Sequence, residues 1–220
     1  MLSYRKLAMR VLGRPLHTGG IDSPRPASQR AAALVLTAAM LTTFTAPAFA
    51  KTWYIEDGDI TISASETKGT NKVSQGAEPE VEDTGTIITN RDKNTASSHT
   101  VTIEAGNDKV EVTLDNVNIK ADSGSALISK GDVTLTLKGD NHLTGGNGGS
   151  SSYGGDGITS SGSLTVSDST VTATGGNGGS ARGSHGGNGI SGKGSLTVSG
   201  GTVTANGGNG SKSESSDRSN

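Results

Sequence analysis

The chain of 220 residues contains no cysteine and very few aromatic residues. Without cysteine, neither a disulfide framework nor a thiolate metal site can form. Two Phe, three Tyr and one Trp make up 3% of the chain, too few to fill an ordinary globular core. Small and β-branched residues must therefore do the packing, which favours a thin, extended fold.

The chain also lacks a strong net charge, at −2 overall. Residues 1–50 hold six Lys/Arg and one acidic residue, which leaves 13 basic and 20 acidic residues after them. An acidic remainder argues against nucleic acid or an anionic membrane surface as a partner. The 34 glycines stand in clusters and not in a G-X-Y register, which excludes collagen.

Residues 1–50 are predicted to be a signal peptide with a long basic segment. The apolar run AAALVLTAAMLTTF from Ala31 to Phe44 is too short to span a membrane comfortably. Ala48-Phe49-Ala50 then supplies the small residues of a cleavage site, so cleavage is expected after Ala50. We therefore expect a secreted or cell-surface protein with no membrane segment after cleavage, and a buried N-terminal helix is the alternative.

A 32-residue repeat dominates the C-terminal part of the chain. Leu164, Val166, Val171 and Asn177 return as Leu196, Val198, Val203 and Asn209. A fixed period of this kind indicates stacked supersecondary units. Each unit has three short segments that alternate apolar and polar residues, and Leu127, Ile158 and Ile190 are equivalent positions in the third of them. We predict an all-β chain folded as a right-handed parallel β-helix, a solenoid with about three short strands per rung of 31–32 residues; a β-sandwich is the alternative.

The expected organisation has three parts after the signal peptide. Residues 51–109 form an irregular N-terminal cap and the first strands, residues 110–210 form the rungs, and residues 211–220 form a disordered tail. The last rung is incomplete, which suggests a truncated chain. Within the cap, residues 63–84 read as a polar loop, and Trp53 with Tyr54 either covers the end of the stack or forms a platform for carbohydrate stacking.

The loops after the second strand of a unit are rich in glycine, for example GGNGGSSSYGG before Asp156. Loops on one flank of a solenoid often form its binding face. The simpler interpretation, which we favour for most of these glycines, is that they let the chain turn with positive φ.

Two segments carry a resemblance to a known family. They are Leu114-Asp115-Asn116-Val117-Asn118-Ile119 and the stretch VTLTLKGDN at 133–141, followed by SLTVSxxTVTATGG repeats. With the leader and TWYIEDGDITIS, they make residues 52–210 similar to the secreted carbohydrate-binding domain family of Gram-positive bacteria, whose members resemble polysaccharide lyases in fold. The resemblance implies a right-handed parallel β-helix outside the cell that binds acidic or cellulosic polysaccharides and contains calcium.

Five aspartates fall at turns between the predicted strands and are candidate calcium ligands: Asp115, Asp132, Asp140, Asp156 and Asp168. Asp140 and Asp168 are predicted to share a corner in successive rungs, and Asp115 precedes them there. Stacked turns could bring the carboxylates together, where their repulsion would favour a bridging cation. The alternative is that Asp is simply a good turn residue.

No catalytic residues are predicted. A lyase would need a Lys or Arg base, and Lys120, Lys130, Lys138 and Lys193 qualify by residue type alone. GxSxG, Walker and Rossmann patterns are absent from the sequence. We therefore expect a non-catalytic, extracellular carbohydrate-binding or adhesive domain, with a structural stalk or surface-layer element and a polysaccharide lyase as alternatives. The expected partner is a polysaccharide, either an acidic plant-type glycan or a cellulosic one.

Overall fold

The computed structural model describes residues 50–211. The predicted signal peptide up to residue 49 and the tail from 212 to 220 lie outside these residues. The described part is all-β, with one short 3-10 helix, η1, at Ile55–Asp57. None of the helices in residues 50–211 is long and apolar enough to cross a membrane.

The strands are short, apart from two that run through a bend. They are β1 (Thr52–Tyr54), β2 (Ile60–Ala64), β3 (Asn71–Gln75), β4 (Val81–Asp83), β5 (Ile87–Thr89), β6 (Val101–Asp115), β7 (Asn118–Lys120), β8 (Leu127–Lys138), β9 (Asp140–Thr144), β10 (Ile158–Ser160), β11 (Leu164–Ser167), β12 (Thr170–Thr174), β13 (Ile190–Gly192), β14 (Leu196–Val198) and β15 (Thr202–Asn206).

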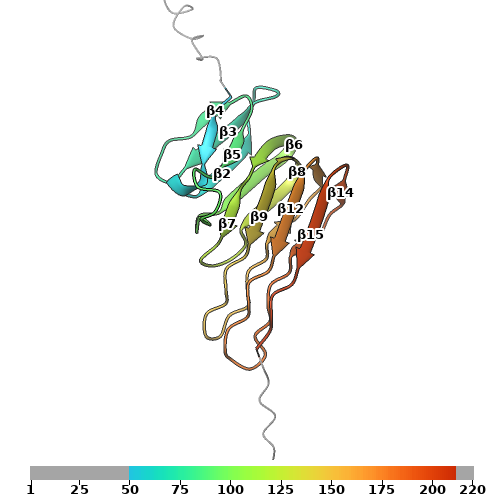
Figure 1. The fold of residues 1–220 in the computed structure, drawn as a ribbon. Helices are drawn as coiled ribbons and strands as arrows, with labels where there is room; N and C mark the ends of the chain where they lie inside the picture. Colours follow the sequence, from blue (N-terminus) through green and yellow to red (C-terminus); the bar gives the residue numbers. More distant parts are fainter. Residues whose placement is uncertain (1–49, 212–220) are drawn as a thin grey trace, which may run out of the picture. The chain divides into compact units, whose positions relative to one another are not determined.

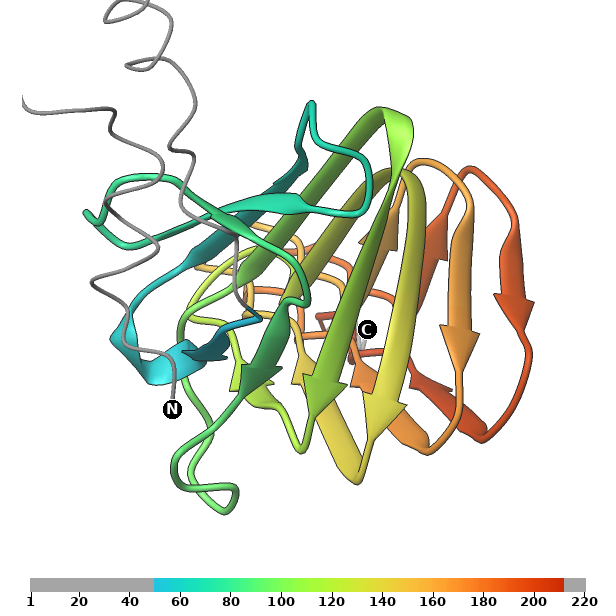
Figure 2. The ribbon, with the colours of Figure 1, turned by 90° about the horizontal axis from the view of Figure 1, so that it is seen from above.

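The strands pair in three parallel columns. Column 1 contains β2, the start of β6, the start of β8, β10 and β13. Column 2 contains β1, β5, the ends of β6 and β8, β11 and β14. Column 3 contains β7, β9, β12 and β15. The chain passes through the columns in this order and enters a loop after column 3, and Figures 1 and 2 show the units following one another.

From β6 onward, the spacing between paired residues grows along the chain. In column 1, Val101 pairs with Leu127, Leu127 with Ile158, and Ile158 with Ile190, which are steps of 26, 31 and 32 residues. The predicted period of 31–32 residues is therefore confirmed for the later units only. The first step is shorter because its loop has only the few residues between Lys120 and Leu127. Parallel pairing also begins earlier than residue 110, since Ile60 already pairs with Val101.

Glycine marks the bend between columns 1 and 2. Gly106 and Gly131 lie inside β6 and β8 with φ of 61° and 83°, a left-handed backbone that favours glycine. A Cβ on Gly162 would meet the carbonyl oxygen of Gly131, and a Cβ on Gly194 would meet that of Gly162. The corner is therefore tight in every later unit, because neighbouring backbones are in contact there.

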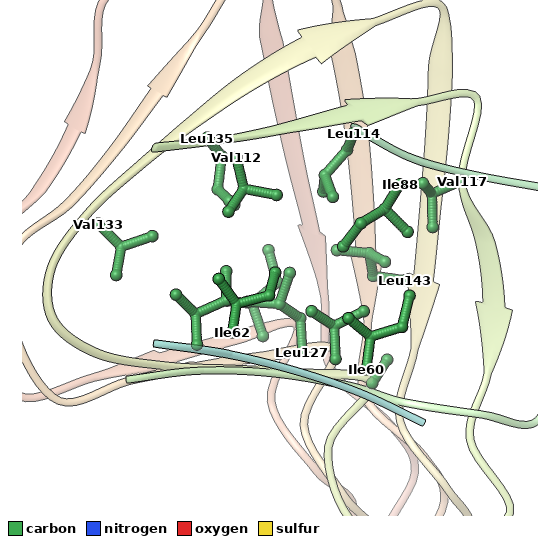
Figure 3. Close-up of a cluster of buried hydrophobic side chains, with 14 of the residues drawn as sticks. Ile60, Ile62, Ile88, Val112, Leu114, Val117, Leu127, Val133, Leu135 and Leu143 are labelled. Atoms are coloured by element: carbon green, nitrogen blue, oxygen red, sulfur yellow. The ribbon is translucent and has the colours of Figure 1, made fainter. Parts of the chain in front are cut away.

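The core is a single cluster between the three columns (Figure 3). Side chains of Val112, Leu135 and Val166 stack in register, each no more than 2% exposed, and Ile119, Leu143 and Ala173 do the same in column 3. The outward positions between them carry mainly Thr, Ser and Asn. Period-2 alternation in the sequence therefore predicted the inward face correctly.

The N-terminal end of the stack is covered by an antiparallel hairpin. Strand β3 pairs antiparallel with both β2 and β4. The prediction of a loop over 63–84 was therefore wrong. The inward residues of β3 include Asn71 and Gln75, both 7% exposed, so the strand does not show the apolar alternation that would have revealed it.

The C-terminal end of the described stack is uncovered. Leu164 and Val166 are 1% exposed, whereas their equivalents Leu196 and Val198 are 46% and 47% exposed. The difference arises because no further strand pairs with β14 within the described residues.

The glycine loops pack on one another through their backbones. Gly155 N donates to Gly146 O and Gly187 N to Gly176 O within their loops, and Gly176 N donates to Gly155 O between neighbouring loops, each at 2.8 Å. A Cβ on Gly176 would meet the carbonyl oxygen of Gly146. Among the loop glycines at 145–157, 175–189 and 207–210, positive φ occurs at Gly183 alone. The turn interpretation was therefore wrong for most of them, because close backbone contact, and not positive φ, requires glycine.

Candidate functional site

Trp53 is not available to stack on a carbohydrate. Its side chain is 2% exposed and belongs to the core cluster, and its Nε1 donates to Asp83 Oδ2 at 2.7 Å. Tyr54 is 36% exposed, but the guanidinium of Arg91 lies 4.3 Å from the centre of its ring. Trp53 therefore helps to cover the N-terminal end, and a sugar site has to be sought elsewhere.

A cleft of about 810 Å³ lies between the N-terminal hairpin and the first parallel strands. Its walls are the loop at 65–70, the segment at 84–87 and the middle of β6 at 108–113. Hydroxyl, amide and charged groups line most of it: Ser65, Glu66, Lys68, Thr70, Asn71, Thr84, Thr86, Asp108, Lys109, Glu111 and Thr113. The cleft has a volume typical of small-ligand sites, and its surface is divided between polar and apolar atoms.

Asn71 holds the walls of the cleft together. Its Nδ2 donates to Thr86 Oγ1 and to the carbonyl oxygen of Glu111, both at 2.9 Å. The loop at 65–70 is closed by its own hydrogen bonds, including Thr70 Oγ1 to the Thr67 carbonyl at 2.6 Å. The polar groups of the cleft are therefore carried by backbone with defined hydrogen bonds.

Charges of both signs face this cleft. Lys109 Nζ donates to Glu111 Oε1 at 2.7 Å, and this hydrogen bond raises the pKa of Lys109 above its usual value. The charge of Glu111 acts in the same direction, burial opposes it, and Asp132, paired in register with Lys109, adds a smaller attraction. Lys109 therefore remains cationic throughout the neutral range.

A second exposed feature lies in the glycine loops. Tyr153 is 68% exposed, and its ring centroid lies 5.4 Å from that of His185 in the next unit, with the planes tilted by 33°. The loops beneath them are held by main-chain hydrogen bonds, such as Gly154 N to the His185 carbonyl at 2.9 Å. Tyr153 and His185 thus form an exposed aromatic pair on loops that main-chain hydrogen bonds hold together.

The structure does not gather the five candidate calcium ligands. Asp115 lies opposite Lys138, Asp132 opposite Lys109, and Asp140 opposite Thr170. Asp168 precedes Thr170 by two residues, so it shares a corner with Asp140 but does not face it. Within residues 50–211, no three acidic or histidine side chains converge in a way that could hold a metal ion.

The same aspartates have structural hydrogen bonds in several cases. Asp156 Oδ1 accepts from Asn188 N at 2.7 Å, and its Oδ2 accepts from Thr159 Oγ1 at 2.9 Å, which ties two units together. Asp115 Oδ1 accepts from Asn116 Nδ2 at 2.6 Å. Asp168 has a φ of 63°, a left-handed conformation that Asp tolerates better than most residues. The turn interpretation of Asp is sufficient to explain these contacts.

The lysines proposed by type are also dispersed. Lys130 Nζ pairs with Glu104 Oε1 at 2.6 Å, Lys120 lies opposite Thr144, and Lys138 lies opposite Asp115. Lys193 lies beyond β13, where its backbone N donates to the Ser160 carbonyl. The four come from different positions and do not line the cleft.

Sequence reasoning missed the cleft because its residues come from three segments that lie far apart in the chain. The polar stretch at 65–71 looked like an ordinary loop, and Lys109 and Glu111 looked like solvated strand positions. The one available signal was the concentration of charge in the irregular part before the repeats. Comparison with known proteins adds no assignment, since no family model, curated protein or solved structure matches the chain. The family resemblance stays a prediction.

Proposed function

We propose that this chain is secreted, loses its leader after Ala50, and folds as a right-handed parallel β-helix that binds polysaccharide without acting on it. The three parallel columns, repeated at steps of 30–32 residues, support the β-helix. The Ala48-Phe49-Ala50 sequence supports secretion.

The cleft carries the proposal of polysaccharide binding. Sugars present many hydroxyl groups, and the cleft offers hydroxyl, amide and charged partners for them along its walls. Lys68 and Lys109 would attract the carboxylates of an acidic polysaccharide, and Glu66, Asp108 and Glu111 would accept hydrogen bonds from the hydroxyl groups of a cellulosic one. Both classes of polysaccharide are therefore proposed as ligands. The described residues do not form a calcium cage by themselves, so calcium enters only as a condition of the binding assay.

Affinity electrophoresis in gels that contain polygalacturonate or a soluble cellulose derivative tests this proposal. We expect retardation of the protein, and about five- to tenfold weaker binding for Lys109→Gln, which removes a cation from the cleft. Lys130→Gln is the matched control, because Lys130 has an equivalent ion pair with Glu104 outside the cleft. An unretarded wild-type protein, with and without calcium, would sink the proposal. Incubation with polygalacturonate should release no unsaturated product, and ultraviolet absorption would instead indicate a lyase.

The second candidate is a structural stalk or surface-layer element. The packed glycine loops favour it, because they add a rigid, nearly side-chain-free layer to the stack. A full-length protein that binds no glycan and is anchored to the cell wall would support this alternative.

A further inference from the structure

Lys51 follows the predicted cleavage site directly, and both of its main-chain polar groups form hydrogen bonds with the fold. Its backbone N donates to Asp83 Oδ1 at 3.0 Å, and its carbonyl oxygen accepts from Ile87 N at 3.3 Å. Its Nζ lies 3.6 Å from the centre of the Trp53 ring. Parallel pairing between β1 and β5 starts at the next residue, Thr52. Lys51 is therefore held by main-chain hydrogen bonds directly after the predicted cleavage site.

Asp83 is a buried carboxylate that has only uncharged donors. It is 1% exposed and accepts from Trp53 Nε1 at 2.7 Å, Lys51 N at 3.0 Å and Gly85 N at 3.1 Å. None of the ion pairs found in residues 50–211 includes it. A buried charge without an opposite charge is expensive to fold, so a cation at this position would stabilise the protein.

We propose that cleavage after Ala50 supplies this cation. Hydrolysis of the Ala50–Lys51 peptide bond consumes one water: the Ala50 carbonyl leaves with the leader as a carboxylate, and the Lys51 nitrogen becomes an amine that takes up a proton. The new α-ammonium group lies where the Lys51 amide lay, against Asp83 Oδ1. The hydrogen bond to the Asp83 carboxylate, whose donor was an uncharged amide, becomes an ion pair in which the donor also carries a charge.

The same cleavage changes the candidate binding site. Ala50 lines the cleft and faces Gly85, where an added Cβ would approach the Ala50 Cβ to 3.2 Å. Removal of Ala50 takes one apolar residue off the cleft wall and leaves the α-ammonium of Lys51 anchored on Asp83. Processing thus completes the N-terminal end of the fold and opens the cleft. This inference rests on the leader cleavage proposed above, but not on glycan binding.

The first test is the N-terminus of the secreted protein, measured by intact mass and N-terminal sequencing. We expect the protein to begin at Lys51. A protein that begins at Phe49, after Ala46-Pro47-Ala48, or at any other residue would overturn the proposal.

The second test measures the coupling between the α-ammonium and Asp83. The processed protein is compared in urea unfolding with the same chain retaining Ala50, each with and without Asp83→Asn. Retention of Ala50 should raise the unfolding equilibrium constant roughly tenfold in the wild type and less than about twofold in Asp83→Asn. Glu82→Gln, a neighbour bonded to Ser65, should keep the full effect. An equal effect of Ala50 with and without Asp83 would contradict the ion pair.

A third measurement applies if Asp83→Asn does not fold. The α-amine of the processed wild-type protein is acylated at neutral pH and followed by mass spectrometry. It should react roughly tenfold more slowly in the native protein than in urea, because an ion-paired amine stays protonated. Equal rates would overturn the proposal. Failure of glycan binding would leave all three readouts unchanged, which separates the two proposals.

Discussion

At the corner between columns 2 and 3, the side-chain amides of buried asparagines form hydrogen bonds with main-chain N–H and carbonyl groups. Asn141 is fully buried; its Oδ1 accepts from Val117 N at 2.9 Å, and its Nδ2 donates to the Thr170 carbonyl at 3.1 Å. Asn90, 3% exposed, bonds both main-chain groups of Asn118: its Oδ1 accepts from Asn118 N at 2.7 Å, and its Nδ2 donates to the Asn118 carbonyl at 3.1 Å. Each side chain therefore joins neighbouring units where the strands themselves are interrupted.

Replacement of Asn141 by leucine should lower the free energy of unfolding by about 1–3 kcal/mol, because buried main-chain groups of Val117 and Thr170 lose their partner. Urea denaturation measures the change. Asn206→Leu at the exposed end of β15 serves as the control and should alter stability by less than about 0.5 kcal/mol. Similar losses for both would show that Asn141 has no special role.

The ion pair of Arg91 and Asp57 predicts a pH dependence. Two hydrogen bonds of 2.6 Å from the guanidinium lower the pKa of Asp57 below its ordinary value of 3.8. A small loss of hydration opposes this, and the charges of Arg91 and, more weakly, Lys51 add to it. A lowered native pKa gives stabilisation that is complete above the ordinary value and is lost as the pH falls through the native one. In an NMR titration, Arg91→Gln should return the Asp57 midpoint towards 3.8, whereas Lys130→Gln should leave it unchanged.

At the scale of the element, the glycine loops are the least ordinary part of the fold. Their main-chain groups bond to loops of neighbouring units, and glycine is required because carbonyl oxygens occupy the space of a Cβ. They are therefore packed elements, although they contain no strand.

Gly176→Ala should destabilise the protein by about 1–3 kcal/mol, because the new methyl group would overlap the Gly146 carbonyl in the packed layer. Gly149→Ala is the matched control: it has open space for a Cβ and no positive φ, and should be neutral or stabilising by less than about 1 kcal/mol. Thermal unfolding of the two variants checks the difference. Equal melting temperatures would contradict the packing argument.

The sequence predicted those strands in which apolar and polar side chains alternate. Leu164, Val166 and Val171 revealed their strands, because every inward residue is apolar and every outward one is polar. Strand β3 was missed because Asn71 and Gln75 point inward and satisfy their hydrogen bonds there. The glycine loops were misread because a stretch without side chains has no periodicity to display. The cleft depends on contacts between such unpredicted segments and could not be foreseen.

At the scale of the whole molecule, the described stack has two different ends. The N-terminal end is covered by β3, β4 and Trp53, whereas Leu196 and Val198 are half-exposed at the other. The last two units between these ends match residue for residue, since β11 pairs with β14 and β12 with β15 at the same step of 32 residues.

A duplication of residues 164–195 should therefore insert one additional unit without loss of the fold. We expect a larger urea m-value and an unchanged or higher unfolding midpoint, because the new unit buries further surface. A duplication of residues 165–195, which omits Leu164 from the copy, is the control: the alternation of the copied strand is displaced by one residue, so Thr165 takes an inward position and the midpoint should fall. Equal behaviour of the two insertions would refute the register argument.

The packing of the glycine loops also restricts how this sequence can evolve. A substitution at most of these glycines would add a side chain where neighbouring backbone already lies, so we expect few such substitutions to be tolerated. Whole units can be gained or lost by recombination, because the repeat preserves the backbone register. We therefore expect gradual divergence to be confined to the outward faces of the strands and to the loop tips, where a new side chain meets solvent and not backbone.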